Sequence, residues 1–315
     1  MKNYLYLLSF FVLSAFSQSP DNSTVKIAEN IEKTTFVYAE KDSSILKLDK
    51  YRLKNTTDIQ ACIFFVFGGG FTDGERDNPG YNNYFNFLTQ NGFTVISIDY
   101  RLGLSGGKQN VGPTNYKPLQ NAINLAVSDL FDATNFALKH ATEWSIDSSK
   151  FIITGSSAGA ITVLQAEYEI CNKLSSSNIL PANFQYAGVI SFSGAIFRTD
   201  GGLKWKNEKP CPIMMFHGDA DKIVPYNSIK FFKIGFFGSK HIADNLRKNN
   251  CSYWFTSFKG AAHEVATIMM DERQTEILEF IQKFILKKEN TQIDMNINEM
   301  WKDKPKKSQS YKDLY

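Results

Sequence analysis

The chain has 315 residues, of which 43% are hydrophobic and 14% aromatic, and its net charge is +3. This length fits either one α/β domain of about 250 residues with tails or two domains. The charge is too small to indicate binding to nucleic acid or to an anionic membrane, so we expect no nucleic-acid partner.

The N-terminus has the pattern of a targeting signal. Lys2 gives a positive start, residues 4–16 are apolar, and Ser17 ends a small-residue cleavage site before Gln18. The alternative is a transmembrane anchor, but the apolar run is shorter than the ~20 residues that cross a bilayer. We therefore expect a signal peptide at 1–17, export of the protein to the periplasm or the extracellular space, and no stable membrane span.

Beyond a polar leader at 18–33, apolar runs typical of strands alternate with stretches of helical periodicity. The first two strands alternate apolar and polar residues and read as an antiparallel hairpin at a sheet edge. The pattern predicts an α/β fold: a mostly parallel sheet of about eight strands, flanked by helices. Strands are expected at 35–38, 45–53, 61–67, 93–98, 151–153, 187–191, 213–216 and 253–257, and helices at 80–91, 118–140, 160–170, 226–249 and 265–286.

These elements place one catalytic domain at 34–287. The connection at 195–211 is too short for a large cap domain, so we expect an open or loop-lined site. Residues 288–315 are polar and charged, and we expect a tail: either a loosely packed solvated extension or a binding or sorting segment. Oligomeric state cannot be read from these patterns.

The four cysteines fit an oxidising compartment, which permits disulfides. Cys211 and Cys251 each precede a predicted strand, so a Cys211–Cys251 bridge is one option, although sequence alone does not fix the pairing. Cys62 opens a buried strand and is expected in the core, and Cys171 has no assigned partner. No cysteine or histidine spacing is typical of a metal site, so we expect no metal.

The segment around Ser157 has the order strand, tight turn, helix. An apolar run at 151–153 leads into Gly-Ser-Ser-Ala-Gly at 155–159, and a helical stretch follows. In a nucleophile elbow the serine lies on a strained turn, and the residues two before and two after it must be small. The pattern alone also fits a simple Gly/Ser-rich turn, but its flanking elements favour an exposed nucleophile at Ser157.

Partners for this serine follow other predicted strands, at the sheet edge where open α/β sheets bind ligands. Three glycines after the strand at 61–67 can expose backbone N–H groups; Gly69, Gly70 and Ala158 are the expected oxyanion donors. Asp221 is the expected acid, with Asp219 as the alternative or as a brace for the turn. His263, in the loop after the last predicted strand, is the expected base. His217 is expected to be structural, as are the histidines in predicted helices, His140 and His241.

The order Ser157, Asp221, His263 resembles that of α/β-hydrolases of the carboxylesterase/lipase group, over about residues 35–286. The resemblance implies those three residues as nucleophile, acid and base, Gly69, Gly70 and Ala158 as oxyanion donors, and a structural role for residues 99–101. Many relatives have His-Gly-Gly-Gly, and here Phe67 replaces the histidine. The matching pieces are Phe-Gly-Gly-Gly-Phe at 67–71, residues 97–102, Gly-Ser-Ser-Ala-Gly at 155–159, His-Gly-Asp-Ala-Asp-Lys-Ile-Val-Pro at 217–225, and His263.

We therefore expect a carboxylic ester hydrolase that forms an acyl-enzyme and uses no metal or organic cofactor. Short-chain esters, or acetyl and feruloyl groups on polysaccharides, are the expected substrates. A serine peptidase or a thioesterase of the same fold is the alternative, because specificity depends on the pocket loops. A non-catalytic binding protein that kept the hydrolase shape is a further alternative.

Overall fold

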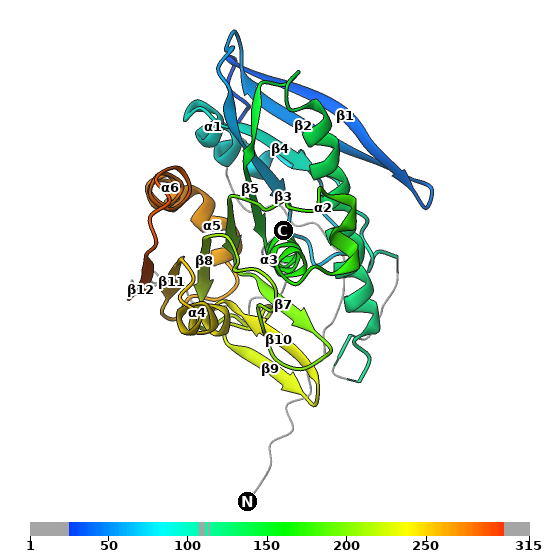
Figure 1. Cartoon of the computed structure of the whole chain (residues 1–315), viewed down its shortest axis with the longest axis vertical. Helices are drawn as coiled ribbons and strands as arrows, with labels where there is room; N and C mark the ends of the chain where they lie inside the picture. The colour runs from blue at the N-terminus through cyan, green and yellow to red at the C-terminus, as the bar shows by residue number, and fades with distance from the viewer. Residues whose placement is uncertain (1–24, 107–110, 113, 299–315) are drawn as a thin grey trace, which may run out of the picture.

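The computed structural model describes residues 25–106, 111–112 and 114–298 (Figure 1). The predicted signal peptide at 1–17, the leader up to residue 24 and the tail from residue 299 lie outside these residues. Within the described residues no helix has both the length and the apolar character needed to cross a membrane.

The described residues form a central sheet of nine strands in the order β1-β2-β4-β3-β5-β6-β8-β11-β12. β1 pairs with β2, and β2 with β4, in antiparallel fashion, and all the remaining pairs of this sheet are parallel. The strands are β1 (Ile31–Lys41), β2 (Ser44–Leu53), β3 (Gln60–Val66), β4 (Thr94–Ile98), β5 (Ile146–Ser156), β6 (Gly188–Phe192), β8 (Ile213–Gly218), β11 (Tyr253–Phe258) and β12 (Gln292–Ile297).

Helices cover both faces of this sheet (Figure 1). α1 and α5 contact each other on one face, and α2 and α3 contact each other on the other. The central strands are therefore buried on both sides, which explains their continuous apolar runs. The α-helices are α1 (Asn82–Gln90), α2 (Lys117–His140), α3 (Ala158–Cys171), α4 (Ser239–Lys248), α5 (Val265–Glu272) and α6 (Gln274–Phe280). Two short 3₁₀ helices, η1 (Pro79–Tyr81) and η2 (Ser175–Ile179), and a π-helix, η3 (Ile281–Leu286), complete the helical elements described. The predicted mostly parallel sheet flanked by helices is confirmed, and residues 25–106, 111–112 and 114–298 contain no large cap domain.

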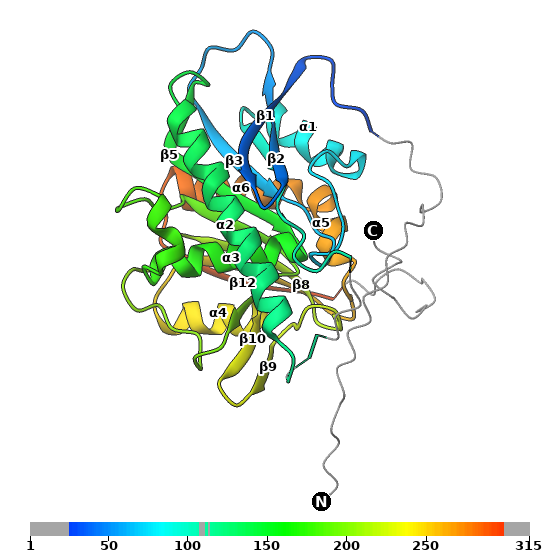
Figure 2. The same cartoon turned by 90° about the vertical axis from the view of Figure 1, so that its right-hand side faces the viewer.

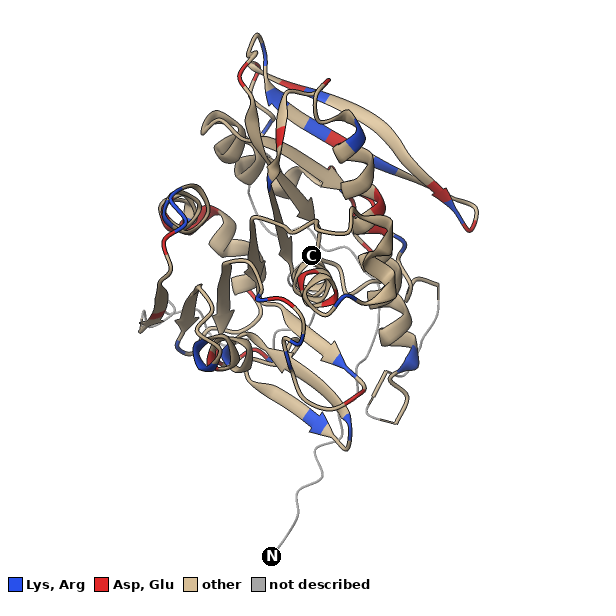
Figure 3. Ribbon diagram, viewed as in Figure 1, with Lys and Arg blue, Asp and Glu red and all other residues tan. Residues whose placement is uncertain are grey.

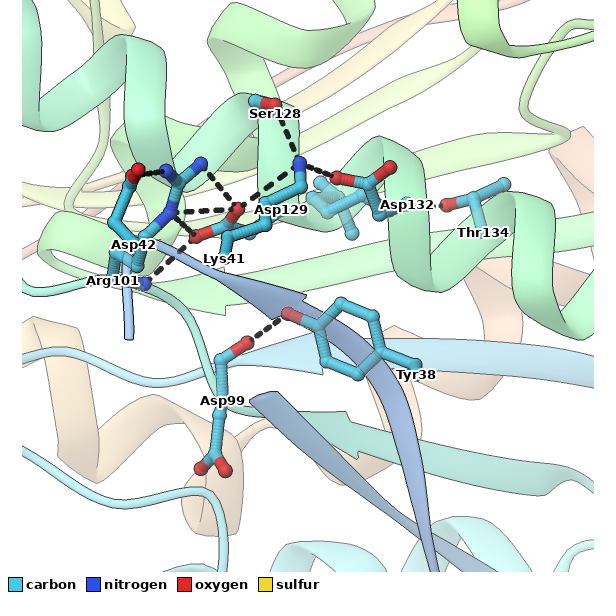
Figure 4. Close-up of polar contacts among 10 residues, drawn as sticks. Tyr38, Lys41, Asp42, Asp99, Arg101, Ser128, Asp129, Asp132 and Thr134 are labelled. Atoms are coloured by element: carbon cyan, nitrogen blue, oxygen red, sulfur yellow. Dashed lines mark hydrogen bonds and ion pairs between the residues drawn. The ribbon is translucent and has the colours of Figure 1, made fainter. Parts of the chain in front are cut away.

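An ionic network centred on Asp129 ties the N-terminal hairpin to helix α2 (Figure 4). Asp129, fully buried in α2, accepts hydrogen bonds from the guanidinium of Arg101 at 2.7–3.1 Å and from the Arg101 backbone N–H at 2.8 Å. Lys41 and Asp42, at the tip of the β1–β2 hairpin, pair with Asp132 and Arg101. The Tyr38 hydroxyl donates to the carbonyl of Asp99 at 2.6 Å. Residues 99–101 thus serve the structure here.

The prediction of a continuous helical region at 226–249 is wrong. β9 (Ser228–Phe231) and β10 (Ile234–Gly238) form a hairpin, and only α4 after it is helical. In the described residues this hairpin joins β7 (Ala195–Arg198) in a second sheet of three strands, ordered β7-β10-β9. Cross-strand pairing with β7, which is distant in sequence, overrides the local helical pattern.

Part of the expected polar tail is also ordered. Residues 292–297 form β12, which pairs with β11 in parallel and exposes alternate side chains. Backbone pairing along the sheet edge stabilises this segment, together with the packing of Ile293, Met295 and Ile297 against the core.

All four cysteines are buried and carry free thiols, so the Cys211–Cys251 bridge is not formed in the structure. Cys62 lies in the core as expected. The carboxylate of Glu167, fully buried in α3, accepts from the Cys171 thiol at 3.2 Å and from the Cys211 backbone N–H at 2.8 Å. Burial raises the pKa of Glu167 above its ordinary value.

The turn from β5 into α3 is closely packed, which is why small residues occupy it. A Cβ on Gly155 would lie 2.4 Å from the backbone of Gly159. A Cβ on Gly159 would lie 1.9 Å from the carbonyl oxygen of Val66, at the end of β3. These distances are far below van der Waals contact, so only glycine lets α3 begin this close to β3.

We expect Gly159→Ala to lower the free energy of unfolding by at least about 2 kcal/mol, because the added methyl overlaps backbone that cannot move independently. Chemical denaturation monitored by fluorescence would measure this. Gly202→Ala is the matched control: a Cβ there meets nothing within 4 Å. An equal effect of the two substitutions would contradict the packing argument.

Candidate active site

Ser157 lies on the turn between β5 and α3. Its backbone has φ 51° and ψ −113°, which a side-chain-bearing residue adopts only under strain. Its N–H donates to the carbonyl of Phe192 at 2.9 Å, so the neighbouring strand β6 holds the turn in place. Adjacent Ser156 points elsewhere: its hydroxyl donates to the carbonyl of Ala266 at 2.8 Å. The strained turn thus presents one serine hydroxyl beyond the end of the sheet.

The structure brings Ser157, His263 and Asp221 together from three separate loops. Ser157 Oγ lies 2.7 Å from His263 Nε2, and His263 Nδ1 lies 2.7 Å from Asp221 Oδ2. Because a carboxylate only accepts, Nδ1 carries the hydrogen, and Nε2 is left to accept from the Ser157 hydroxyl. The imidazole is therefore in the tautomer that a general base needs.

Asp221 is held by the loop that follows β8. Its Oδ1 accepts from the backbone N–H groups of Ile223 at 2.8 Å and Val224 at 3.0 Å, which leaves Oδ2 directed at His263. Burial alone would raise the pKa of Asp221, but the charges and hydrogen bonds of His263 and His217 outweigh it and lower this pKa well below its ordinary value. The carboxylate is therefore ionised under all ordinary conditions.

The sequence predicted a structural role for His217, but its ring lies directly behind Asp221. Its Nε2 is 3.3 Å from Asp221 Oδ2 and 3.3 Å from the carbonyl of Val224, so it faces two acceptors and carries a hydrogen. Its Nδ1 is 2.8 Å from the hydroxyl of Ser239, at the start of α4. Asp221 thus has an imidazole on either side, and His217 also joins β8 to α4 through Ser239, a contact that local sequence does not reveal.

Asp219, the alternative acid, serves as a brace. Its carboxylate accepts from the backbone N–H of Gly260 at 2.7 Å, in the loop that carries His263. Glu264 adds a second bond to that loop by accepting from the N–H of Ala262 at 2.9 Å. Of the two other histidines, His140 bonds the carbonyl of Phe136 within α2, and His241 lies in α4.

The glycine loop after β3 turns back on itself. Gly69, Gly70 and Phe71 all have positive φ, and the Gly69 carbonyl accepts from the N–H groups of Thr72 and Asp73 at 3.0 and 3.2 Å. Since C=O and N–H of one peptide point in opposite directions, the Gly70 N–H points away from that turn. In the described part of the chain, the N–H groups of Gly69, Gly70 and Ala158 have no protein acceptor. These three N–H groups are free to receive a ligand oxygen.

Phe67, at the position of the histidine of many relatives, braces this loop in another way. Its ring stacks on Tyr100 with centroids 4.4 Å apart, and the Tyr100 hydroxyl donates to its carbonyl at 3.1 Å. Tyr100 also meets Phe71 edge to face, with ring centroids 6.2 Å apart. An aromatic cluster therefore holds both ends of the Gly-Gly-Gly segment.

Within the described residues no group of three or more His, Cys, Asp or Glu side chains could hold a metal ion. The site consists of a serine hydroxyl, an imidazole, an ionised carboxylate and unpaired backbone donors. These groups can carry out nucleophilic attack, proton transfer and stabilisation of an oxyanion.

Comparison with known proteins adds a family match. A sequence model of the BD-FAE family matches residues 48–196, which include the glycine loop and Ser157. The fumonisin B1 esterase of Sphingopyxis macrogoltabida is 28% identical over 98 residues. That match covers 31% of this chain and 18% of the esterase, so the chain aligns with only a small part of that protein.

Solved structures of esterases share the fold. The esterase Est2 of the planctomycete Thermogutta terrifontis with bound propionate superposes with a TM-score of 0.58 at 20% identity, covering 81% of this chain and 95% of that one. The same esterase phosphonylated by cyclosarin gives 0.57 at 20% identity, with 84% and 97% covered. With the sheet order and the strained serine turn, these matches show that the chain has the α/β-hydrolase fold.

Proposed function

We propose that this protein hydrolyses carboxylic esters through an acyl-enzyme on Ser157. The observation that carries the proposal is the unbroken line of 2.7 Å contacts from Ser157 through His263 to Asp221. The BD-FAE match and the esterases among its relatives and structural neighbours support ester hydrolysis.

In the first half-reaction His263 Nε2 removes the Ser157 proton while Oγ attacks the ester carbonyl carbon. Asp221 stabilises the resulting imidazolium and keeps the ring oriented. The negative oxygen of the tetrahedral intermediate would be held by the N–H groups of Gly69, Gly70 and Ala158, at the N-terminus of α3 where the helix dipole favours negative charge. Collapse of the intermediate transfers the proton from His263 to the leaving alcohol and leaves the acyl-enzyme.

In the second half-reaction water replaces the alcohol. His263 takes a proton from water, the hydroxide adds to the acyl carbonyl, and the intermediate collapses to release the carboxylic acid. Ser157 recovers its proton from His263, so the cycle consumes one ester and one water. No step requires a cofactor.

For the substrate we propose short-chain esters, including acyl groups carried by polysaccharides. Est2 of Thermogutta terrifontis is described with propionate and with butyrate bound, which supports small acyl groups. We also propose that the protein acts outside the cytoplasm, because of the signal pattern at 1–17.

We expect Ser157→Ala to lower kcat for p-nitrophenyl acetate by about 10⁶ relative to the wild type, because the nucleophile is lost. Ser156→Ala is the matched control, since the Ser156 hydroxyl bonds the carbonyl of Ala266 and should leave most activity in place. Parallel assays with a thioester and a peptide anilide would distinguish the thioesterase and peptidase alternatives. Equal ester hydrolysis by Ser157→Ala and the wild type would rule out Ser157 as the nucleophile.

His217 offers a second test, because we propose that it positions Asp221. A hydrogen bond to a charged group contributes about 1.5–3 kcal/mol, so His217→Phe should lower kcat per titrated active site by roughly 10–100-fold with KM almost unchanged. His217→Gln, whose amide can still donate, should restore part of the loss. The lowered pKa of Asp221 keeps its carboxylate ionised in acid, so protonation of Asp221 should not contribute to any loss of kcat/KM that the wild type shows at low pH. Loss confined to KM or to thermal stability would mean that His217 has only a packing role.

A further inference from the structure

The β9–β10 hairpin projects from one end of the molecule in both orthogonal views (Figure 1 and Figure 2). Its two turn residues are Phe232 and Lys233, because Phe231 pairs directly with Ile234. Phe232 is 93% exposed, which makes it the most exposed of the large hydrophobic side chains described. It also has φ 52°, at the first position of a two-residue turn, where glycine is favoured. Both the exposure of the ring and the positive φ make an aromatic residue unfavourable for stability at this position, which points to a role in binding rather than in folding.

The hairpin has two different faces. Register places Ile229 opposite Phe236 and Phe231 opposite Ile234, so four apolar side chains share one face. Ile229 and Phe231 are 36% and 43% exposed. The opposite face packs on the core through buried Phe237, and exposed Lys230 extends over the Phe237 ring, with its Nζ 5.3 Å from the ring centroid. An apolar outer face therefore continues into the exposed tip.

Charge on the hairpin is of one sign (Figure 3). Residues 228–238 contain Lys230 and Lys233 and no Asp or Glu, and both lysines are exposed. Lys230 also acts on α4: burial lowers the pKa of His241, and the charge of Lys230 lowers it further. Although the net charge of the whole chain is small, the tip combines protruding aromatic rings with positive charge.

We propose that the β9–β10 tip docks on an anionic phospholipid surface, with Phe231 and Phe232 in the acyl–headgroup boundary and the two lysines at the phosphates. The geometry disfavours other occupants. The two rings meet at 86° with centroids 4.7 Å apart, so they offer no flat platform for a sugar ring. A symmetric contact with a second copy would bring the same lysines against each other. The contact is peripheral and independent of the ester chemistry.

Vesicle co-sedimentation of the predicted exported form, beginning at Gln18, tests this docking. The protein should bind vesicles of equal phosphatidylglycerol and phosphatidylcholine roughly 30-fold more tightly than pure phosphatidylcholine, because each lysine contributes about fivefold. Binding should weaken as salt is raised. Lys230→Gln with Lys233→Gln should abolish the preference for anionic vesicles.

Phe232→Gly separates docking from folding, because glycine suits the backbone of the turn. It should lower vesicle binding at least about tenfold, with Tm unchanged or raised and p-nitrophenyl acetate hydrolysis unchanged. Ile59→Ser is the control: Ile59 is 75% exposed but lies between β2 and β3, and its loss should not affect binding.

The proposal would be overturned if the wild type failed to sediment, or if Phe232→Gly bound as tightly as the wild type. It would equally be overturned if the wild type bound insoluble xylan, or dimerised at high concentration, and Phe232→Gly abolished that xylan binding or dimerisation while vesicle binding persisted. In those cases the occupant is a polysaccharide or a second copy.

Discussion

The close approach of α3 to the end of β3 is the constraint on which the site depends. Gly155 and Gly159 let the helix begin where any side chain would overlap backbone, and this forces Ser157 into a strained conformation. The same approach places the N-terminus of α3 beside the glycine loop, so unpaired N–H groups from two segments lie at one end of the sheet. Two hydrogen bonds offset the strain of the turn: the Ser157 N–H donates to the carbonyl of Phe192, and the Ser156 hydroxyl donates to the carbonyl of Ala266.

A second constraint operates on the acid. Asp221 is buried with an imidazole on each side and two backbone donors on its other oxygen. A carboxylate so placed remains ionised and has one orientation. His217 and Asp219 come from the same segment as Asp221 but do different things: the first contacts the carboxylate, and the second holds the loop of His263. The loop after β8 therefore positions His263 twice, through the contact of Asp221 with its ring and through the bond of Asp219 to its loop.

The sequence predicted much of the fold because buried parallel strands have continuous apolar runs, and it predicted that Ser157, Asp221 and His263 would meet because parallel strands end at one edge. The sequence-based prediction failed where contacts between segments distant in sequence determine the structure. Residues 226–238 fit a helical period as well as a strand period, and only pairing with β7 decides between them. β12 was missed because it lies in a polar, charged stretch, although its polar and apolar residues alternate as in a strand. The contact of His217 with Asp221 was missed because it depends on a loop that curls back after β8.

Covalent labelling tests the central claim most directly. Est2 of Thermogutta terrifontis, a structural neighbour, is described as phosphorylated by paraoxon. If Ser157 is the activated nucleophile, paraoxon should add a single diethylphosphoryl group to the protein, on the peptide that contains Ser157, and esterase activity should disappear in proportion. Peptide mass spectrometry would locate the group. A folded protein that remained unlabelled, or that carried the label on another residue, would contradict the account.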